Sequence, residues 1–191
     1  MKKDYLLLLM RSKNTIFTFK EISLMWGVSD AEFLEKKIYR YIKSGKLYSI
    51  RRGIYAKDKT YDKLELATKI NIPAYVSFET VLAQNGIVFQ YYSQIFVASY
   101  LTREITCGDQ VYSFKKIKDV TLTNSLGIEN KGTYFIASPE RAFLDTLYLN
   151  KDYHFDNLLN LNWEKVFEIL PIYGHNKRMQ KKIKEYKSYA E

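Results

Sequence analysis

The residues of this 191-residue chain best suited to a chemical task are cations and one phenol within its first sixty positions. Lysine and arginine side chains bind nucleic-acid phosphates, and an arginine fork can bind a guanine edge through two hydrogen bonds. Their types and spacing predict contacts with DNA rather than catalysis. The candidate DNA-binding residues are Lys36, Tyr39, Arg40, Lys43, Arg51 and Arg52.

The net charge of +9 is distributed unevenly along the chain. Residues 1–60 contain fourteen basic and six acidic side chains, a net charge of +8. Residues 61–175 have a net charge of −3, and residues 176–191 have a net charge of +4. A concentrated positive segment is typical of a surface that binds phosphates, although a solvated surface that only keeps the protein soluble would give the same sum.

The basic residues at the end of the chain lie on a predicted helix over 176–189. Met179, Ile183 and Tyr186 form a narrow apolar stripe on this helix. The helix either packs on the body of the protein or contacts a nucleic acid or an anionic membrane, and the stripe lacks the bulk of a membrane anchor. Its cations are Lys177, Arg178, Lys181, Lys182, Lys184 and Lys187.

The residue patterns of common enzymes and metal sites do not occur in the sequence. His154 and His175 are the only histidines, and they lack metal-ligand spacing. Cys107 is the only cysteine and has no histidine near it to activate it. There is no glycine-rich phosphate loop and no pair of aspartates in a nucleotidyltransferase pattern. We therefore predict a protein that is not an enzyme and holds no cofactor and no metal.

Two short helices joined by a tight turn are predicted to position the N-terminal cations. Thr18-Phe19-Lys20-Glu21 has the form of a capping box, and the helix that it opens ends at Gly27. Ser29-Asp30-Ala31-Glu32 has the form of a second capping box, which opens a helix running to Ser44. This pattern is typical of a helix-turn-helix.

A basic turn between two strand-like segments follows the second helix. The segments 46–50 and 54–56 surround Arg51-Arg52-Gly53, and this order after a helix-turn-helix predicts a winged helix. We expect Arg51 and Arg52 to contact the DNA backbone or the minor groove.

The second helix of the pair is predicted to have an apolar face and a basic face. Leu34 and Ile38 lie on the apolar face, and Arg40 on the opposite face is the candidate for a guanine contact. Lys36 and Lys43 are expected to bind phosphates. The alternatives are an ordinary amphipathic helix with a basic exposed face, or a winged helix that binds protein.

The rest of the chain predicts an α+β fold with no internal repeat. We expect a winged helix-turn-helix domain over 1–60, followed by a mixed α/β domain over 61–191 with a helical C-terminal segment. Ser77 is expected to cap a helix over 78–85, and Ser138-Pro139-Glu140 to open another. Further helices are expected at about 155–161, 163–170 and 176–189, and strands at 95–98, 110–115 and 132–136.

Three motifs stand out along the chain: Arg51-Arg52-Gly53-Ile54-Tyr55, Tyr75-Val76-Ser77-Phe78-Glu79-Thr80-Val81-Leu82 and Ser138-Pro139-Glu140-Arg141-Ala142-Phe143-Leu144-Asp145. These motifs and their order resemble the AbiEi antitoxin family of type IV (AbiE-type) toxin–antitoxin systems, which act in abortive infection. The resemblance spans about residues 3 to 170. It implies a winged helix that binds inverted repeats in its own promoter, and a C-terminal domain that counteracts a nucleotidyltransferase-like toxin without necessarily contacting it.

Four charged residues of these motifs have two interpretations. They are either a polar site used in antitoxicity or helix-start electrostatics together with an Arg141–Asp145 salt bridge. The four residues are Glu79, Glu140, Arg141 and Asp145.

The sequence also allows two other functions. The protein is then either a winged-helix regulator without a toxin or an RNA-binding protein that protects the toxin's target. The apolar stretch Tyr5–Met10 is too short for a signal peptide, and no apolar run reaches membrane length. We expect a cytoplasmic protein without membrane contact, monomeric in solution and binding DNA as two copies.

Overall fold

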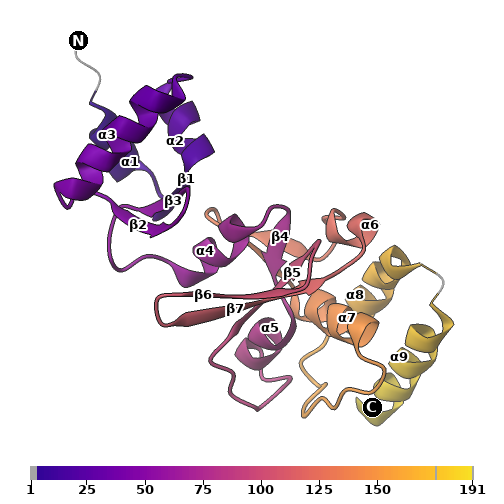
Figure 1. Cartoon of the computed structure of the whole chain (residues 1–191). Helices are drawn as coiled ribbons and strands as arrows, with labels where there is room; N and C mark the ends of the chain where they lie inside the picture. Colours follow the sequence, from indigo (N-terminus) through magenta and orange to yellow (C-terminus); the bar gives the residue numbers. More distant parts are fainter. Residues whose placement is uncertain (1–3, 175, 191) are drawn as a thin grey trace.

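Three helices and a three-stranded antiparallel sheet form the N-terminal part of the computed structural model, which describes residues 4–174 and 176–190 (Figure 1). The strands lie in the order β1-β3-β2. Residues 48–56 form a hairpin whose two strands are β2 and β3. The elements are α1 (Tyr5–Arg11), β1 (Ile16–Thr18), α2 (Phe19–Trp26), α3 (Ala31–Lys43), β2 (Tyr48–Arg51) and β3 (Ile54–Ala56).

The first predicted capping box is confirmed. The Thr18 hydroxyl accepts a hydrogen bond from the Glu21 amide at 3.2 Å, and the Glu21 carboxylate accepts one from the Thr18 amide at 2.7 Å. Helix α2 ends at Gly27, whose φ of 64° is the left-handed conformation that glycine adopts at low cost.

The second predicted capping box is wrong, because α3 begins one residue later than the pattern suggested. Asp30 is the N-cap, and its carboxylate accepts a hydrogen bond from the Phe33 amide at 3.1 Å. An aspartate satisfies the open amides at a helix start as well as a serine does, so Ser29 remains outside the helix.

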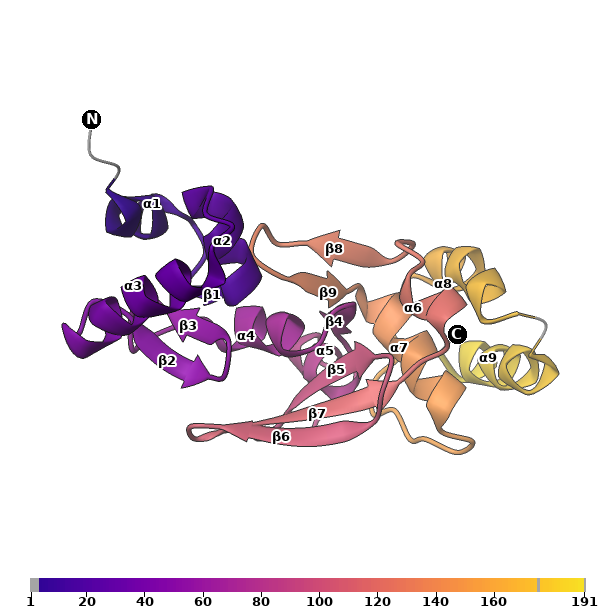
Figure 2. The same cartoon turned by 45° about the horizontal axis from the view of Figure 1, so that its top comes forward.

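A mixed six-stranded sheet forms the centre of the remaining chain, in the order β6-β7-β5-β4-β9-β8 (Figure 2). Strand β4 pairs parallel with β9 and antiparallel with β5, and β5 pairs parallel with β7. The strands are β4 (Ala74–Val76), β5 (Ile95–Ser99), β6 (Arg103–Cys107), β7 (Gln110–Lys116), β8 (Ile128–Asn130) and β9 (Phe135–Ala137). The strand predicted over 132–136 lies at Phe135–Ala137 instead, because residues 128–134 form β8 and the turn after it.

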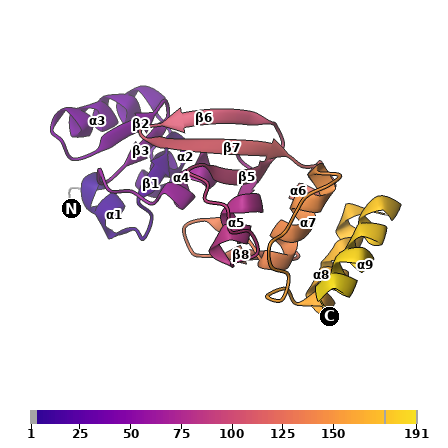
Figure 3. The same ribbon diagram turned by 90° about the horizontal axis from the view of Figure 1, so that it is seen from below.

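Helices surround this sheet, and the last of them lie at the end of the molecule away from α1–α3 (Figure 3). Helix α7 starts as predicted, with the Ser138 hydroxyl accepting from the Arg141 amide at 3.2 Å and Pro139 in the first turn. The fold is therefore mixed α+β with a helical C-terminal segment. The helices are α4 (Lys63–Ile70), α5 (Phe78–Gln84), α6 (Asp119–Leu122), α7 (Pro139–Leu149), α8 (Trp163–Ile169), the 3-10 helix η1 (Leu170–Tyr173) and α9 (Lys177–Ala190).

The predicted helix over 155–161 is wrong. Phe155 and Leu161 are buried, but Leu159 between them is 76% exposed, and the segment is a loop. The amides of Asp156 and Asn157 both donate to the Ile87 carbonyl, at 2.9 and 3.2 Å. These long-range bonds satisfy amides that a helix would have bonded internally.

Ser77 occupies the predicted N-cap position of α5, but its side chain does not cap the helix. Its hydroxyl makes no cap hydrogen bond and donates instead to Asp145 at 2.7 Å. The chain enters α5 through Phe78, whose φ of 55° is rare for a residue with a bulky side chain. Phe78 is fully buried, so the surrounding packing holds this strained conformation.

Contacts across the predicted boundary at residue 60 join the N-terminal part to the rest. The core beneath α1–α3 includes Trp26 and Leu34, whereas Ile16, Ile54 and Ala56 pack into the larger core of the six-stranded sheet. Strands β1 and β3 therefore lie between two cores.

A partly buried ionic cluster, here called the joint, lies at the same place. The Lys69 ammonium lies 3.0 Å from Glu21 Oε1 and 3.0 Å from Glu65 Oε1, and it donates to the Ile16 carbonyl at 2.6 Å. Glu65, which is fully buried, accepts from the amide and hydroxyl of Thr15 at 2.8 and 2.7 Å. The joint consists of Thr15, Glu21, Glu65 and Lys69.

Candidate nucleic-acid interface and buried polar network

The exposed side of α3 brings together four of the predicted DNA-binding residues. Leu34 and Ile38 are only 1% and 2% exposed, so the opposite side of the helix faces solvent, as its spacing predicts. Tyr39 is 58% exposed, and the Lys43 ammonium lies 5.4 Å from the centre of its ring. The exposed side chains are Lys36, Tyr39, Arg40 and Lys43.

The cations of α3 differ in their present partners. Lys36 is paired with Glu32 one turn earlier, and both side chains are largely exposed. Exposed pairs of this kind contribute little free energy, so a phosphate can replace Glu32 as the partner of Lys36. The Arg40 side chain makes no hydrogen bond or ion pair within the part of the chain that the structure describes, which leaves its five N–H donors open to a ligand.

The β2–β3 hairpin holds the other two predicted residues. Arg51 is the last residue of β2 and is half-buried, while Arg52 is exposed in the turn. Gly53 closes this turn with a φ of 76°, and its carbonyl accepts a hydrogen bond from the Phe19 amide at 2.8 Å. The hairpin lies beside α3 in the three views (Figures 1–3).

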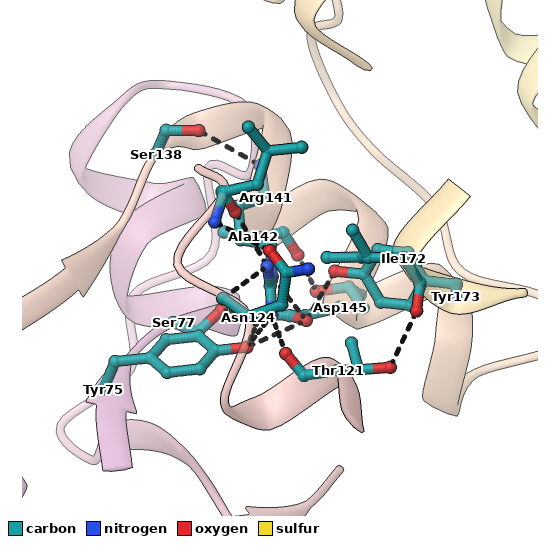
Figure 4. Close-up of polar contacts among 12 residues, drawn as sticks. Tyr75, Ser77, Thr121, Asn124, Ser138, Arg141, Ala142, Asp145, Ile172 and Tyr173 are labelled. Atoms are coloured by element: carbon teal, nitrogen blue, oxygen red, sulfur yellow. Dashed lines mark hydrogen bonds and ion pairs between the residues drawn. The ribbon is translucent and has the colours of Figure 1, made fainter. Parts of the chain in front are cut away.

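A second candidate, unlike the first, is closed to solvent. Arg141 and Asp145 are both completely buried on α7, and Arg141 Nε donates to Asp145 Oδ1 at 3.3 Å (Figure 4). The predicted Arg141–Asp145 salt bridge is therefore confirmed. Its burial was not expected, because charged side chains are seldom fully buried unless they are paired.

Three hydroxyl groups complete the coordination of Asp145. Ser77 and Tyr173 each donate to the carboxylate at 2.7 Å, and Tyr75 donates at 3.0 Å. Because Tyr75 and Ser77 lie at the end of β4 and Tyr173 ends η1, the carboxylate ties two distant segments to α7.

Arg141 directs its remaining donors to the turn around α6. Nη2 donates to the Thr121 carbonyl at 2.6 Å and to the Tyr75 hydroxyl at 2.9 Å, and Nη1 donates to the Leu126 carbonyl at 2.8 Å. These contacts satisfy a buried charge that would otherwise be costly. We call the set Tyr75, Ser77, Thr121, Arg141, Asp145 and Tyr173 the buried network.

The protonation of this network follows from its burial. Burial raises the pKa of Asp145 above its ordinary value, against the opposing effect of Arg141 and the three hydroxyl donors. Burial and the neighbouring Asp145 raise the pKa of Tyr75 and of Tyr173 well above the ordinary phenol value. Both phenols therefore stay protonated near neutral pH and act as donors.

Glu79 and Glu140 do not join Arg141 and Asp145 in one site. Glu79, at the start of α5, pairs with Lys115 on β7, with 2.9 Å between Oε2 and Nζ. Glu140 accepts from the Ser138 hydroxyl at 2.8 Å and from the Asn162 amide at 3.2 Å. The four residues thus make three separate sets of contacts.

Sequence reasoning missed Tyr75, Ser77 and Tyr173 as partners of Asp145. One local signal was present, because residues 75 and 77 lie on the same face of a strand and both have hydroxyl groups. Nothing near Tyr173 indicated its contact.

Within the described ranges, no three His, Cys, Asp or Glu side chains gather as a metal site requires, and no helix is long and apolar enough to cross a membrane. The His154 side chain is 89% exposed, and its Nε2 lies 3.6 Å from Asp156 Oδ1.

Comparison with protein-family models and with curated proteins finds no match for this chain.

Proposed function

We propose that residues 1–60 form a winged helix that binds double-stranded DNA, with α3 in the major groove and the β2–β3 hairpin as the wing. The element order helix, strand, helix, helix and hairpin supports this assignment. A helix that exposes several cations on one side has the size and chemistry to enter the major groove. The observation that carries the proposal is the exposed basic face of α3, which is followed along the chain by a hairpin whose turn holds Arg51 and Arg52.

We further propose that the protein is an antitoxin of the AbiE type that represses its own promoter at inverted repeats and counteracts a nucleotidyltransferase-like toxin. This part rests on the motifs at 51–55, 75–82 and 138–145. The net charge of −3 over residues 61–175 supports a division of labour, because this segment lacks the positive charge that promoter binding requires. Residues 61–175 are left for antitoxicity.

Arg40→Ala is expected to weaken binding to the promoter duplex by about 1–3 kcal/mol and to relax specificity at one base pair. Arg40 is exposed on α3 and has open donors, so it is the residue best placed for a bidentate guanine contact. Fluorescence anisotropy on the promoter duplex and on a scrambled duplex measures this effect. Equal losses of affinity on both duplexes would show that Arg40 contacts a phosphate and not a base.

The double variant Arg51→Ala with Arg52→Ala is expected to weaken DNA binding and to lower the slope of log K against log salt by up to about two units. For each phosphate contact that is lost, the DNA releases about one counterion fewer when the protein binds. Titrations across a range of salt concentrations give the slope. An unchanged slope would show that the hairpin does not contact phosphates.

The same double variant separates repression from protection. When the variant is expressed from a foreign promoter, it should fail to repress a reporter driven by the protein's own promoter. It should still restore growth to cells that express the toxin encoded beside it. Loss of repression with no toxin at that locus would favour a regulator without a toxin. Loss of protection together with DNA binding would contradict the division of labour.

A further inference from the structure

Helix α9 uses its apolar stripe to pack on the body of the protein. Met179 and Ile183 are fully buried. The Tyr186 ring packs edge-on against Phe143 and Phe155, and its hydroxyl donates to the Tyr153 carbonyl at 2.5 Å. The apolar side of α9 is therefore not available to another partner.

Two cations of α9 are engaged in holding the helix in place. Arg178 donates to the Leu147 and Asn150 carbonyls at 2.9 and 2.8 Å, at the C-terminal end of α7 where carbonyl groups lack helical partners. Lys182 lies 3.2 Å from Asp152. The Arg178 hydrogen bonds, together with the buried apolar stripe, fix the rotation of α9 about its axis.

Three other lysines lie on the opposite side of α9 and form what we call the lysine ridge: Lys177, Lys181 and Lys184. All three are exposed, and only Lys181 has an ion pair within the described residues, at 4.0 Å from Glu185. Their spacing of four and three residues places them about 6 Å and about 4.5 Å apart along the helix axis. The ridge is thus a row of cations on a fixed support.

We propose that the lysine ridge is a second nucleic-acid-binding surface, which holds the phosphate backbone of a single strand. A row of exposed cations matches a chain of phosphates, and Tyr189, 85% exposed near the end of α9, is available to stack on a base. A membrane is a poorer partner, because an amphipathic helix binds a bilayer through its apolar face and that face of α9 is buried.

Helix α9, which carries the ridge, lies at the far end of the molecule from α3 (Figures 1 and 2). The segments that contain these two basic surfaces have net charges of +8 and +4, and the chain between them has −3. One molecule can therefore hold two nucleic-acid segments, and the second surface acts independently of promoter binding.

The test uses the full chain with the four substitutions Arg40→Ala, Lys43→Ala, Arg51→Ala and Arg52→Ala, so that the N-terminal surface does not mask the ridge. Into this parent we introduce Lys177→Gln, Lys181→Gln and Lys184→Gln; glutamine favours helix about as well as lysine, so α9 is retained. Fluorescence anisotropy with labelled oligouridine is expected to show that the variant binds on the order of tenfold more weakly than the parent. Its slope of log K against log salt should be lower by about two units.

A matched control changes three exposed lysines of the body, Lys116, Lys118 and Lys151, to glutamine in the same parent. It removes the same charge and is expected to bind oligouridine like the parent. Equal losses in both variants, or no loss in the ridge variant, would overturn the proposal. So would binding of the parent to phosphatidylglycerol vesicles without binding to oligouridine. Promoter binding by the unsubstituted chain is measured separately. The proposal for the lysine ridge and the proposal for promoter binding can therefore fail independently.

Discussion

Asp145→Ala is expected to lower the free energy of unfolding by about 3–5 kcal/mol. The substitution leaves the Arg141 guanidinium fully buried without its counterion. It also removes the acceptor of the Ser77 and Tyr173 hydroxyls, which then lose hydrogen bonds inside the core. Urea denaturation followed by circular dichroism measures the loss.

Two further variants separate the buried charge from the loss of packing. Arg141→Met combined with Asp145→Leu removes both charges and should be less destabilised than Asp145→Ala, because no ion is left unpaired. Glu129→Ala, which breaks the exposed pair with Lys131, should cost less than about 1 kcal/mol. A cost for Asp145→Ala as small as that of Glu129→Ala would mean that the buried network contributes little.

Lys69→Met is expected to destabilise the protein by a similar amount, about 3–5 kcal/mol, and to weaken DNA binding as well. Without the ammonium, the fully buried Glu65 carboxylate loses its counterion, and Glu21 loses its link to α4. Because Glu21 also closes the capping box of α2, the position of α2 and α3 relative to the body depends on the joint. Thermal unfolding and promoter titration report the two effects.

Rescue identifies the unpaired carboxylate as the cause. Adding Glu65→Gln to Lys69→Met should recover part of the stability, since an amide can still accept from Thr15 without a buried charge. Lys63→Met is the matched control, because its pair with Asp109 is exposed and is worth little. If Lys69→Met leaves both the unfolding midpoint and the promoter affinity unchanged, the joint does not position the N-terminal part.

The amino-acid sequence by itself determined the local features of this protein. The limits of α2 follow from Thr18, Glu21 and Gly27, because a capping box and a left-handed glycine act within a few residues. The start of α7 follows in the same way from Ser138 and Pro139. Helical periodicity alone likewise separates the buried and exposed faces of α3.

Only the tertiary structure decided which distant groups meet. Asp145 bonds with Tyr75, seventy positions earlier, and with Tyr173, twenty-eight positions later. Lys69 reaches Glu21 across forty-eight positions. No local periodicity specifies such pairs, because they arise when packing brings remote segments together and every buried polar group then needs a partner. For the same reason the Ser77 hydroxyl donates to Asp145 and does not cap α5.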